Sequence, residues 1–157
     1  DLFFVLLNSE IRDVSTIFHH VIIGGAFVMG LLTKYTTPYH CVFLINEVST
    51  PFVNFHHFLP RTSPWRTANG VAMWLSFLFG RILINVYILF SMWQVVAANT
   101  DLMLTPPPPP PGVPAMPHVG VLQTSLCLMS QTLNLFWFLK LTRGLLRALA
   151  SKKPKAA

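Results

Sequence analysis

The 157-residue sequence is 53% hydrophobic and only 10% charged, with a formal net charge of +6. A water-soluble domain has about a quarter of its residues charged, so these charges are too few to solvate the surface of a protein of this size. Five of the eleven lysines and arginines fall in the last fifteen residues, and a basic tail after an apolar helix is a topology signal rather than a nucleic-acid surface. The composition predicts an integral membrane protein and excludes a soluble domain that binds nucleic acid.

Four apolar segments are long enough to cross a bilayer, which needs about 20 helical residues. They run from about 14 to 32, 39 to 59, 68 to 98 and 118 to 141, after an apolar stub at residues 1–7. The stub has neither a basic region nor a small-residue cleavage site, so we expect the end of a helix rather than a signal peptide. The predicted fold is all-α: a polytopic transmembrane helical bundle with four full spans plus a truncated N-terminal one.

Proline marks the loop at 99–117, where residues 106–111 are six consecutive prolines. This run predicts a stiff polyproline spacer or, alternatively, a ligand for SH3 or WW domains. Alternating the helices puts nine basic residues on one side of the membrane and Lys34 alone on the other. That bias predicts that the basic tail, residues 146–157, lies on the cytosolic, matrix or stromal side of an endomembrane or organellar membrane (endoplasmic reticulum, mitochondrial inner or plastid membrane).

Ionisable side chains at membrane depth are costly unless they face protein or water, and the first such group is His19-His20. Adjacent helical residues point about 100° apart, whereas a helical zinc site uses i, i+4 spacing, so no metal site is predicted. Histidine titrates near neutrality and can act as a base or nucleophile. The pair is therefore a candidate catalytic site, with hydrogen-bonded packing residues as the alternative.

Two further polar clusters surround Glu47 and Arg81. Asn54 follows Glu47 by seven residues and is expected on the same helix face, and Pro51 between them is expected to kink the helix. Arg81, with Asn85 one turn later, lies at the centre of the third segment and needs a counter-charge. Glu47 is the only acid in the apolar interior of the other spans, so we predict a Glu47–Arg81 ion pair.

With these residues the sequence resembles the TLC domain family, which includes the TRAM and Lag1 proteins. The resemblance covers about residues 1–145. It rests on Asp1, which matches the end of a Gly-Tyr-Phe-Leu-Tyr-Asp-like motif, on His19-His20 after Asp13, on the string Glu47-Val48-Ser49-Thr50-Pro51-Phe52-Val53-Asn54, and on Arg81 in the next long helix. It implies the C-terminal part of a TLC transmembrane domain whose first helices are absent from this sequence.

The resemblance also implies a function. In ceramide synthases the paired histidines serve acyl transfer from acyl-CoA to a sphingoid base, and a His-Asp with a further Asp follows them. The corresponding region here reads Ile45-Asn46-Glu47-Val48-Ser49-Thr50, which is closer to the non-synthase members linked to phospholipid composition and lipid handling.

The hypothesis that follows is a lipid-handling membrane protein, without a cofactor, whose partners are membrane lipids. Its helices would enclose a cavity for an acyl chain or phospholipid, with a polar end formed by His19, His20, Glu47, Asn54, Arg81 and Asn85. One alternative is a structural accessory subunit of a larger membrane complex, without chemistry of its own. A second alternative is a ceramide-synthase-like acyltransferase in which His19 and His20 are catalytic.

Overall fold

A computed structural model describes residues 14–34, 37–101, 108–109, 111–113, 115 and 118–150, and the regular secondary structure of this part of the chain is entirely helical. The chain divides into two compact units. Unit 1 comprises Asp1–Val42 and Ile88–Leu133, and unit 2 comprises Phe43–Tyr87 and Asn134–Ala157. The predicted stub at residues 1–7 and half of the proline run (106, 107 and 110) lie outside the described residues.

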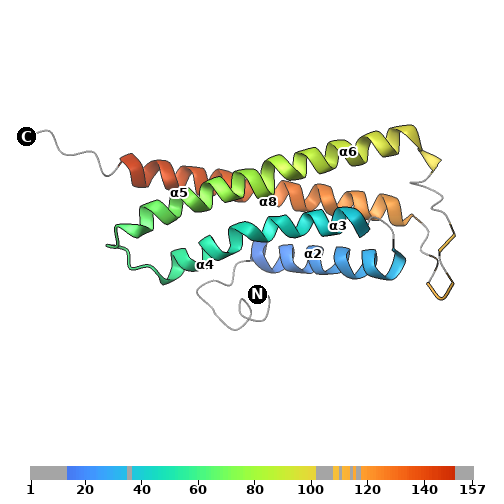
Figure 1. Cartoon of the computed structure of the whole chain (residues 1–157), viewed down its shortest axis with the longest axis horizontal. Helices are drawn as coiled ribbons and strands as arrows, with labels where there is room; N and C mark the ends of the chain where they lie inside the picture. The colour runs from blue at the N-terminus through green and yellow to red at the C-terminus, as the bar shows by residue number, and fades with distance from the viewer. Residues whose placement is uncertain are drawn as a thin grey trace, which may run out of the picture. The chain divides into compact units, whose positions relative to one another are not determined.

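Helices occupy all four predicted segments (Figure 1). In chain order they are α2 (Val14–Thr33), α3 (Thr37–Phe43), η1 (Leu44–Ser49), α4 (Thr50–Phe58), α5 (Trp65–Phe77), η2 (Leu78–Leu83), α6 (Ile84–Ala98) and α8 (Val119–Ala150). Two helical stretches, Val14–Thr33 and Trp65–Ala98, are long and apolar enough to cross a membrane. The helical class is therefore confirmed, while the count of four spans stays a prediction.

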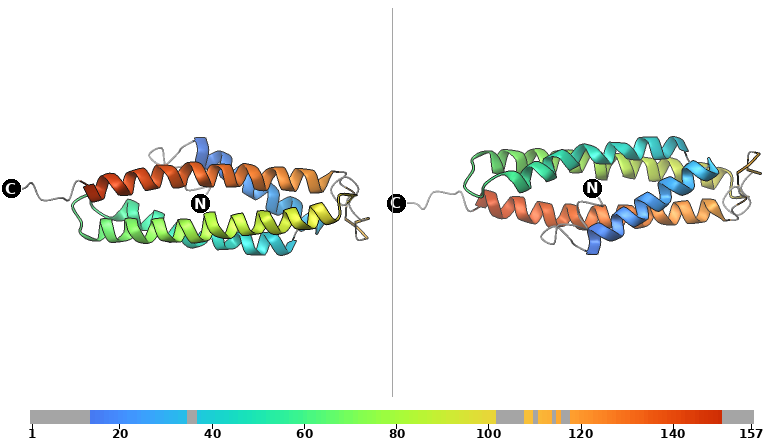
Figure 2. Two further views of the ribbon diagram at one scale, coloured as in Figure 1. Left: turned by 90° about the horizontal axis from the view of Figure 1, so that it is seen from above. Right: turned by 90° about the horizontal axis from the view of Figure 1, so that it is seen from below.

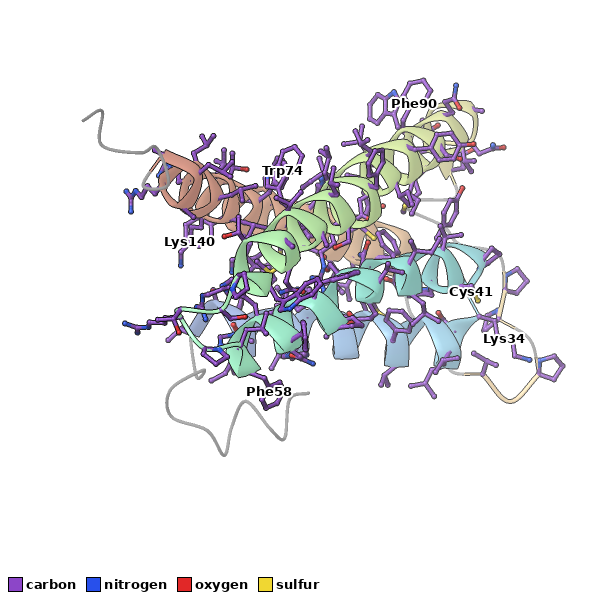
Figure 3. The ribbon with its side chains drawn as sticks, turned by 60° about the vertical axis from the view of Figure 1, so that its left-hand side comes forward. Lys34, Cys41, Phe58, Trp74, Phe90 and Lys140 are labelled. Atoms are coloured by element: carbon purple, nitrogen blue, oxygen red, sulfur yellow. The ribbon has the colours of Figure 1, made fainter. Side chains whose placement is uncertain are left out.

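The polarity of the described surface is inverted relative to a water-soluble protein. The largest side chains that are almost fully buried are all polar: Gln123, Asn85, Asn134 and Ser49. Large apolar side chains are exposed along every long helix, and Figure 3 shows the rings of Phe58 in unit 2 and Phe90 in unit 1 pointing away from their own helices. Such extensive apolar exposure is typical of surfaces that meet lipid or other protein and is consistent with a helical membrane protein.

Unit 1 buries one face of α2. The face consists of residues at helical spacing, namely His19, Ile22, Ala26, Met29 and Gly30. The imidazole of His40 on α3 packs over Gly30, where it fills the space that a Cβ would need, and meets the Phe27 ring edge-on at 5.0 Å between centroids. From α8, the Gln123 amide donates a 3.2 Å hydrogen bond to the Ala26 carbonyl.

Unit 2 is built on α5 and the C-terminal part of α8, which run antiparallel (Figure 2). The Trp74 indole N–H donates to the Thr142 hydroxyl at 2.8 Å. One turn further along α5, the Phe77 ring stacks on Phe138 at 6.2 Å between centroids. Moving forward along α5 thus means moving backward along α8, and this register decides which residues of the two helices lie level.

The α4–α5 connection is held by two side chains of α5. The Arg66 guanidinium donates to the carbonyls of His56 and Leu59, at 3.3 and 2.7 Å, and so satisfies carbonyl groups at the end of α4 that have no helical partner. The Asn69 amide donates to the Phe52 carbonyl at 2.9 Å. These bonds fix α4 against α5 and set the position of η1, which precedes α4.

Both irregular helices of unit 2 pack against each other. η1 is a 3₁₀ segment and η2 is a π-helical segment, a form that often occurs at functional sites. They approach closely because Gly80 in η2 has no side chain: a Cβ at this position would lie 3.2 Å from the Ile45 carbonyl oxygen. Gly80 therefore permits the approach that brings its neighbour Arg81 to η1.

Replacing Gly80 with alanine is expected to lower the free energy of unfolding by about 1 kcal/mol, because the added methyl must displace backbone. The matched control is Gly144→Ala on α8, where the new methyl meets nothing within 4 Å and the gain in helix propensity is expected to stabilise by about 0.5–1 kcal/mol. The measurement is reversible denaturation in mixed micelles followed by circular dichroism. Equal shifts for the two variants would show that the η1–η2 approach is not tight.

Candidate functional site

Arg81 lies in the middle of the polar interior of unit 2. We call Arg81, together with the residues that contact it (Asn46, Glu47, Ser49 and Thr50) and the buried Asn85 and Asn134, the Arg81 centre. Arg81 lies in η2 with only 8% of its side chain exposed. Its Nε donates to the Asn46 carbonyl at 2.9 Å and to the Ser49 hydroxyl at 2.8 Å, and its Nη2 donates to the Thr50 hydroxyl at 3.2 Å. Three acceptors from one short stretch of chain therefore hold the guanidinium.

The ion pair that the sequence predicts is present. Arg81 Nη2 lies 3.8 Å from Glu47 Oε1. Thr50 links the two groups, because its hydroxyl accepts from Arg81 and donates to Glu47 Oε2 at 2.7 Å. The Glu47 side chain is 54% exposed, so the carboxylate lies at the edge of the centre and the guanidinium lies inside it. Together the two groups leave the centre without net charge.

Pro51 explains why η1 can hold an arginine. Proline has no N–H and cannot bond to the Glu47 carbonyl as a regular helix requires. The Thr50 N–H donates to the Glu47 carbonyl instead. In a regular helix the Thr50 N–H would bond to the Asn46 carbonyl, which here accepts a hydrogen bond from Arg81 Nε. The expected kink is therefore a 3₁₀ segment that ends as Pro51 enters the first turn of α4.

The nitrogen Nη1 of the Arg81 guanidinium differs from Nε and Nη2 in its hydrogen bonding. Among the residues that the structure describes, none accepts a hydrogen bond from Arg81 Nη1, although Nε and Nη2 are both bonded. Nη1 is also not completely covered by protein atoms. The Phe77 ring lies against the guanidinium carbon at 5.2 Å from the ring centroid, which is a cation–π contact. Arg81 thus keeps both N–H groups of Nη1 for a further acceptor.

Three buried asparagines, Asn46, Asn85 and Asn134, belong to the same unit as Arg81. The Asn85 side chain lies one turn after Arg81 on the same stretch of helix. The α5–α8 register, continued one turn beyond the Phe77–Phe138 contact, places Asn134 level with Arg81. The Asn46 oxygen Oδ1 and both amide atoms of Asn85 and Asn134 are buried without a hydrogen-bond partner in the described structure. Buried polar groups normally have partners, and the described structure supplies none for these amide atoms.

The centre lies at mid-helix on every element that contributes to it. Arg81 is in the middle of the 34-residue stretch Trp65–Ala98, and Asn134 is in the middle of the 32-residue helix α8. Glu47 is in the middle of the helical run that α3, η1 and α4 form. Of these elements, Trp65–Ala98 is long and apolar enough to cross a membrane, and ionised side chains in the middle of such a stretch are rare and usually functional.

The structure brings together some of the predicted site residues. Glu47, Arg81 and Asn85 belong to the centre in unit 2, whereas Asn54 is exposed on α4 and does not hydrogen-bond to Arg81 within the described chain. His19 and His20 belong to α2 in unit 1, with their ring centroids 5.6 Å apart and His19 buried. Their predicted part in the same site stays a prediction.

Asn134 is the residue that the sequence prediction missed. It lies in an apolar segment beside several other polar residues, and nothing in that segment singles it out. Only the α5–α8 register gives it its place beside Arg81. Its position in the sequence could have indicated it, because an amide side chain in the middle of a membrane-length helix is unusual.

A family model for the TLC domain matches residues 1–143. The chain belongs to the TLC domain family. TLC domain-containing protein 4-B of Danio rerio is 29% identical over 160 residues, which are 97% of this chain and 56% of the relative. TLC domain-containing protein 4-A of Xenopus laevis is 29% identical over 147 residues, 90% of this chain and 52% of the relative. No solved structure matches the chain significantly.

The TLC chain is also 29% identical over 122 residues to Topoisomerase I damage affected protein 4 of Saccharomyces cerevisiae, covering 77% of this chain and 43% of the relative. It spans about half the length of the curated relatives it matches. These relatives are TLC domain-containing proteins and not ceramide synthases. The recognition drawn from the Glu-x-Ser-Thr-Pro-Phe-x-Asn string, closer to the non-synthase members, is therefore confirmed.

Proposed function

We propose that this TLC domain protein handles lipid within the membrane and that the Arg81 centre of unit 2 holds the polar group of an acyl chain or lipid. The observation that supports the proposal most directly is the buried guanidinium with one donor nitrogen to spare, at the middle of an apolar helix. A purely structural ion pair would be expected to use all of its donors, because each unsatisfied polar group in an apolar interior costs stability.

The surrounding residues fit the same role. The amides of Asn85 and Asn134 offer both donors and acceptors without partners of their own in the described structure, and the Phe77 ring adds an apolar wall beside the guanidinium. A lipid carries a polar group and apolar chains in one molecule. It could therefore satisfy the amides with its polar group while its chains lie along apolar side chains.

The test is native mass spectrometry of the purified protein with its co-purifying lipid. Arg81→Gln is expected to retain about thirtyfold less lipid than the wild type, because a hydrogen bond to a charged group contributes about 2 kcal/mol. The matched control is Arg61→Gln in the exposed α4–α5 loop, which removes the same charge and is expected to retain wild-type lipid. Helix content by circular dichroism verifies folding. Equal lipid in all three proteins would refute the proposal.

A further inference from the structure

The Arg81 centre combines three properties that limit what it can bind: its two charges cancel, it contains buried amide oxygens that need a hydrogen-bond donor, and it lies at mid-helix. Each property follows from described contacts in unit 2. Together they distinguish between lipid classes that share the same acyl chains.

Charge balance is the first property. The Arg81 guanidinium already faces the Glu47 carboxylate at 3.8 Å, and Thr50 is hydrogen-bonded to both groups. A phosphate brought to Arg81 Nη1 would therefore enter the field of Glu47 as well as that of Arg81. Like charges this close repel strongly where water is scarce. A neutral polar group meets no such repulsion.

The chemistry of the unpaired amides is the second property. Asn46, Asn85 and Asn134 each present a buried side-chain oxygen without a partner, and Asn85 and Asn134 add their amide nitrogens. A phosphate is mainly an acceptor and leaves such oxygens unpaired. A hydroxyl both donates and accepts, so it can bond to an asparagine oxygen and receive a bond from Arg81 Nη1 or an amide nitrogen. An ester carbonyl beside it can take a second donor.

Depth is the third property. The contributing residues lie at the midpoints of their helices, and a group held there would be near the bilayer centre. A phosphate headgroup must lose its hydration to reach that depth, which is costly for a charged group. A lipid with an uncharged polar group loses much less.

We propose that the Arg81 centre takes the hydroxyl and ester groups of a neutral lipid of the diacylglycerol class in preference to a phosphate-bearing lipid. This inference rests on the proposed lipid-handling function and names the ligand class of the same site. It assigns Asn134 and Asn85 as ligand-binding residues and Glu47 as the residue that excludes anionic headgroups.

The experiment is a competition between 1,2-dioleoylglycerol and dioleoylphosphatidic acid, which have the same acyl chains and differ in the phosphate. The purified protein in detergent is mixed with both lipids at equal concentration, and bound lipid is counted by native mass spectrometry. The wild type is expected to hold diacylglycerol about tenfold over phosphatidic acid. Glu47→Gln, which removes the negative charge with little change of shape, is expected to reverse or abolish that preference.

The asparagines are tested with a matched pair. Asn134→Leu removes a buried amide and is expected to lose most of the diacylglycerol, whereas Asn54→Leu changes an exposed asparagine of the same unit and is expected to bind as the wild type does. If Asn134→Leu does not fold, the lipid preference of Glu47→Gln still tests the inference. Equal binding of the two lipids, or a preference for phosphatidic acid, overturns this inference and leaves lipid handling intact. Binding of neither lipid, together with equal co-purifying lipid in the wild type and Arg81→Gln, defeats both proposals.

Discussion

Replacing Arg81 with methionine is expected to lower the free energy of unfolding by about 3 kcal/mol, the lower end of the cost of breaking a buried ion pair. The lower end applies because the Glu47 carboxylate is half exposed and is not stranded in a dry interior. Part of the loss comes from the Asn46 carbonyl and the Ser49 hydroxyl, which lose their Arg81 donor and keep only the hydrogen bond that the Ser49 hydroxyl donates to the Asn46 carbonyl. The measurement is reversible unfolding in mixed micelles, followed by the loss of helical circular dichroism.

Two companion variants separate the charge of Arg81 from its geometry. Arg81→Lys keeps the charge but has a single ammonium in place of the planar fork, so it is expected to recover less than half of the loss. Glu47→Gln combined with Arg81→Met removes the uncompensated carboxylate and is expected to unfold less readily than Arg81→Met alone. A loss below about 0.5 kcal/mol for Arg81→Met, the range of an ordinary surface substitution, would mean that the η1–η2 contact does not depend on the guanidinium.

Replacing Asn134 with leucine is expected to act in the opposite direction and raise the free energy of unfolding by about 1–2 kcal/mol. Asn134 is 0% exposed, and both of its amide atoms lack a partner in the described structure. A buried polar group without a hydrogen bond costs about 1–3 kcal/mol, and leucine has a similar volume with no polar atom. The same micelle titration measures the change.

The control for this prediction is Asn54→Leu, an exposed asparagine whose replacement is expected to change stability by less than about 0.5 kcal/mol. Destabilisation by Asn134→Leu would show that its amide is already satisfied within the protein. Higher stability together with lost diacylglycerol would instead be the trade-off expected of a binding residue, since such residues are retained at a cost to the fold.

The helical segments could be predicted from the sequence with small errors. The second segment was expected at about 39–59 and is found as the run α3, η1 and α4, and the third was expected from 68 and begins at Trp65. Apolar run length and proline punctuation are local properties of the chain, so they can be read without knowing the fold. The fourth helix extends beyond its expected end at 141 to Ala150, because its last turns are rich in Leu, Arg and Ala, which favour helix even where hydropathy falls.

The Glu47–Arg81 pair could also be predicted, because a charge deep in an apolar segment restricts its partner to another ionisable group in an apolar segment. That argument needs only a count of candidates, and Glu47 was the only acid. It does not extend to Asn54. Spacing of seven residues puts two side chains on one helix face, but Asn54 lies on the exposed part of α4.

The sequence by itself therefore determined the membrane class, the helices and the ion pair at the middle of two of them. Only the tertiary structure decided that Asn134 is fully buried at the level of Arg81 along α5 and α8, that Gly80 lets η1 and η2 meet, and that the carbonyl released through Pro51 serves a guanidinium. The physical reason is that residue spacing specifies which side chains share a helix face, whereas the faces that meet are set by packing between helices distant in sequence. Asparagine is uncharged and so common in loops that its place in a binding site depends on what lies opposite it.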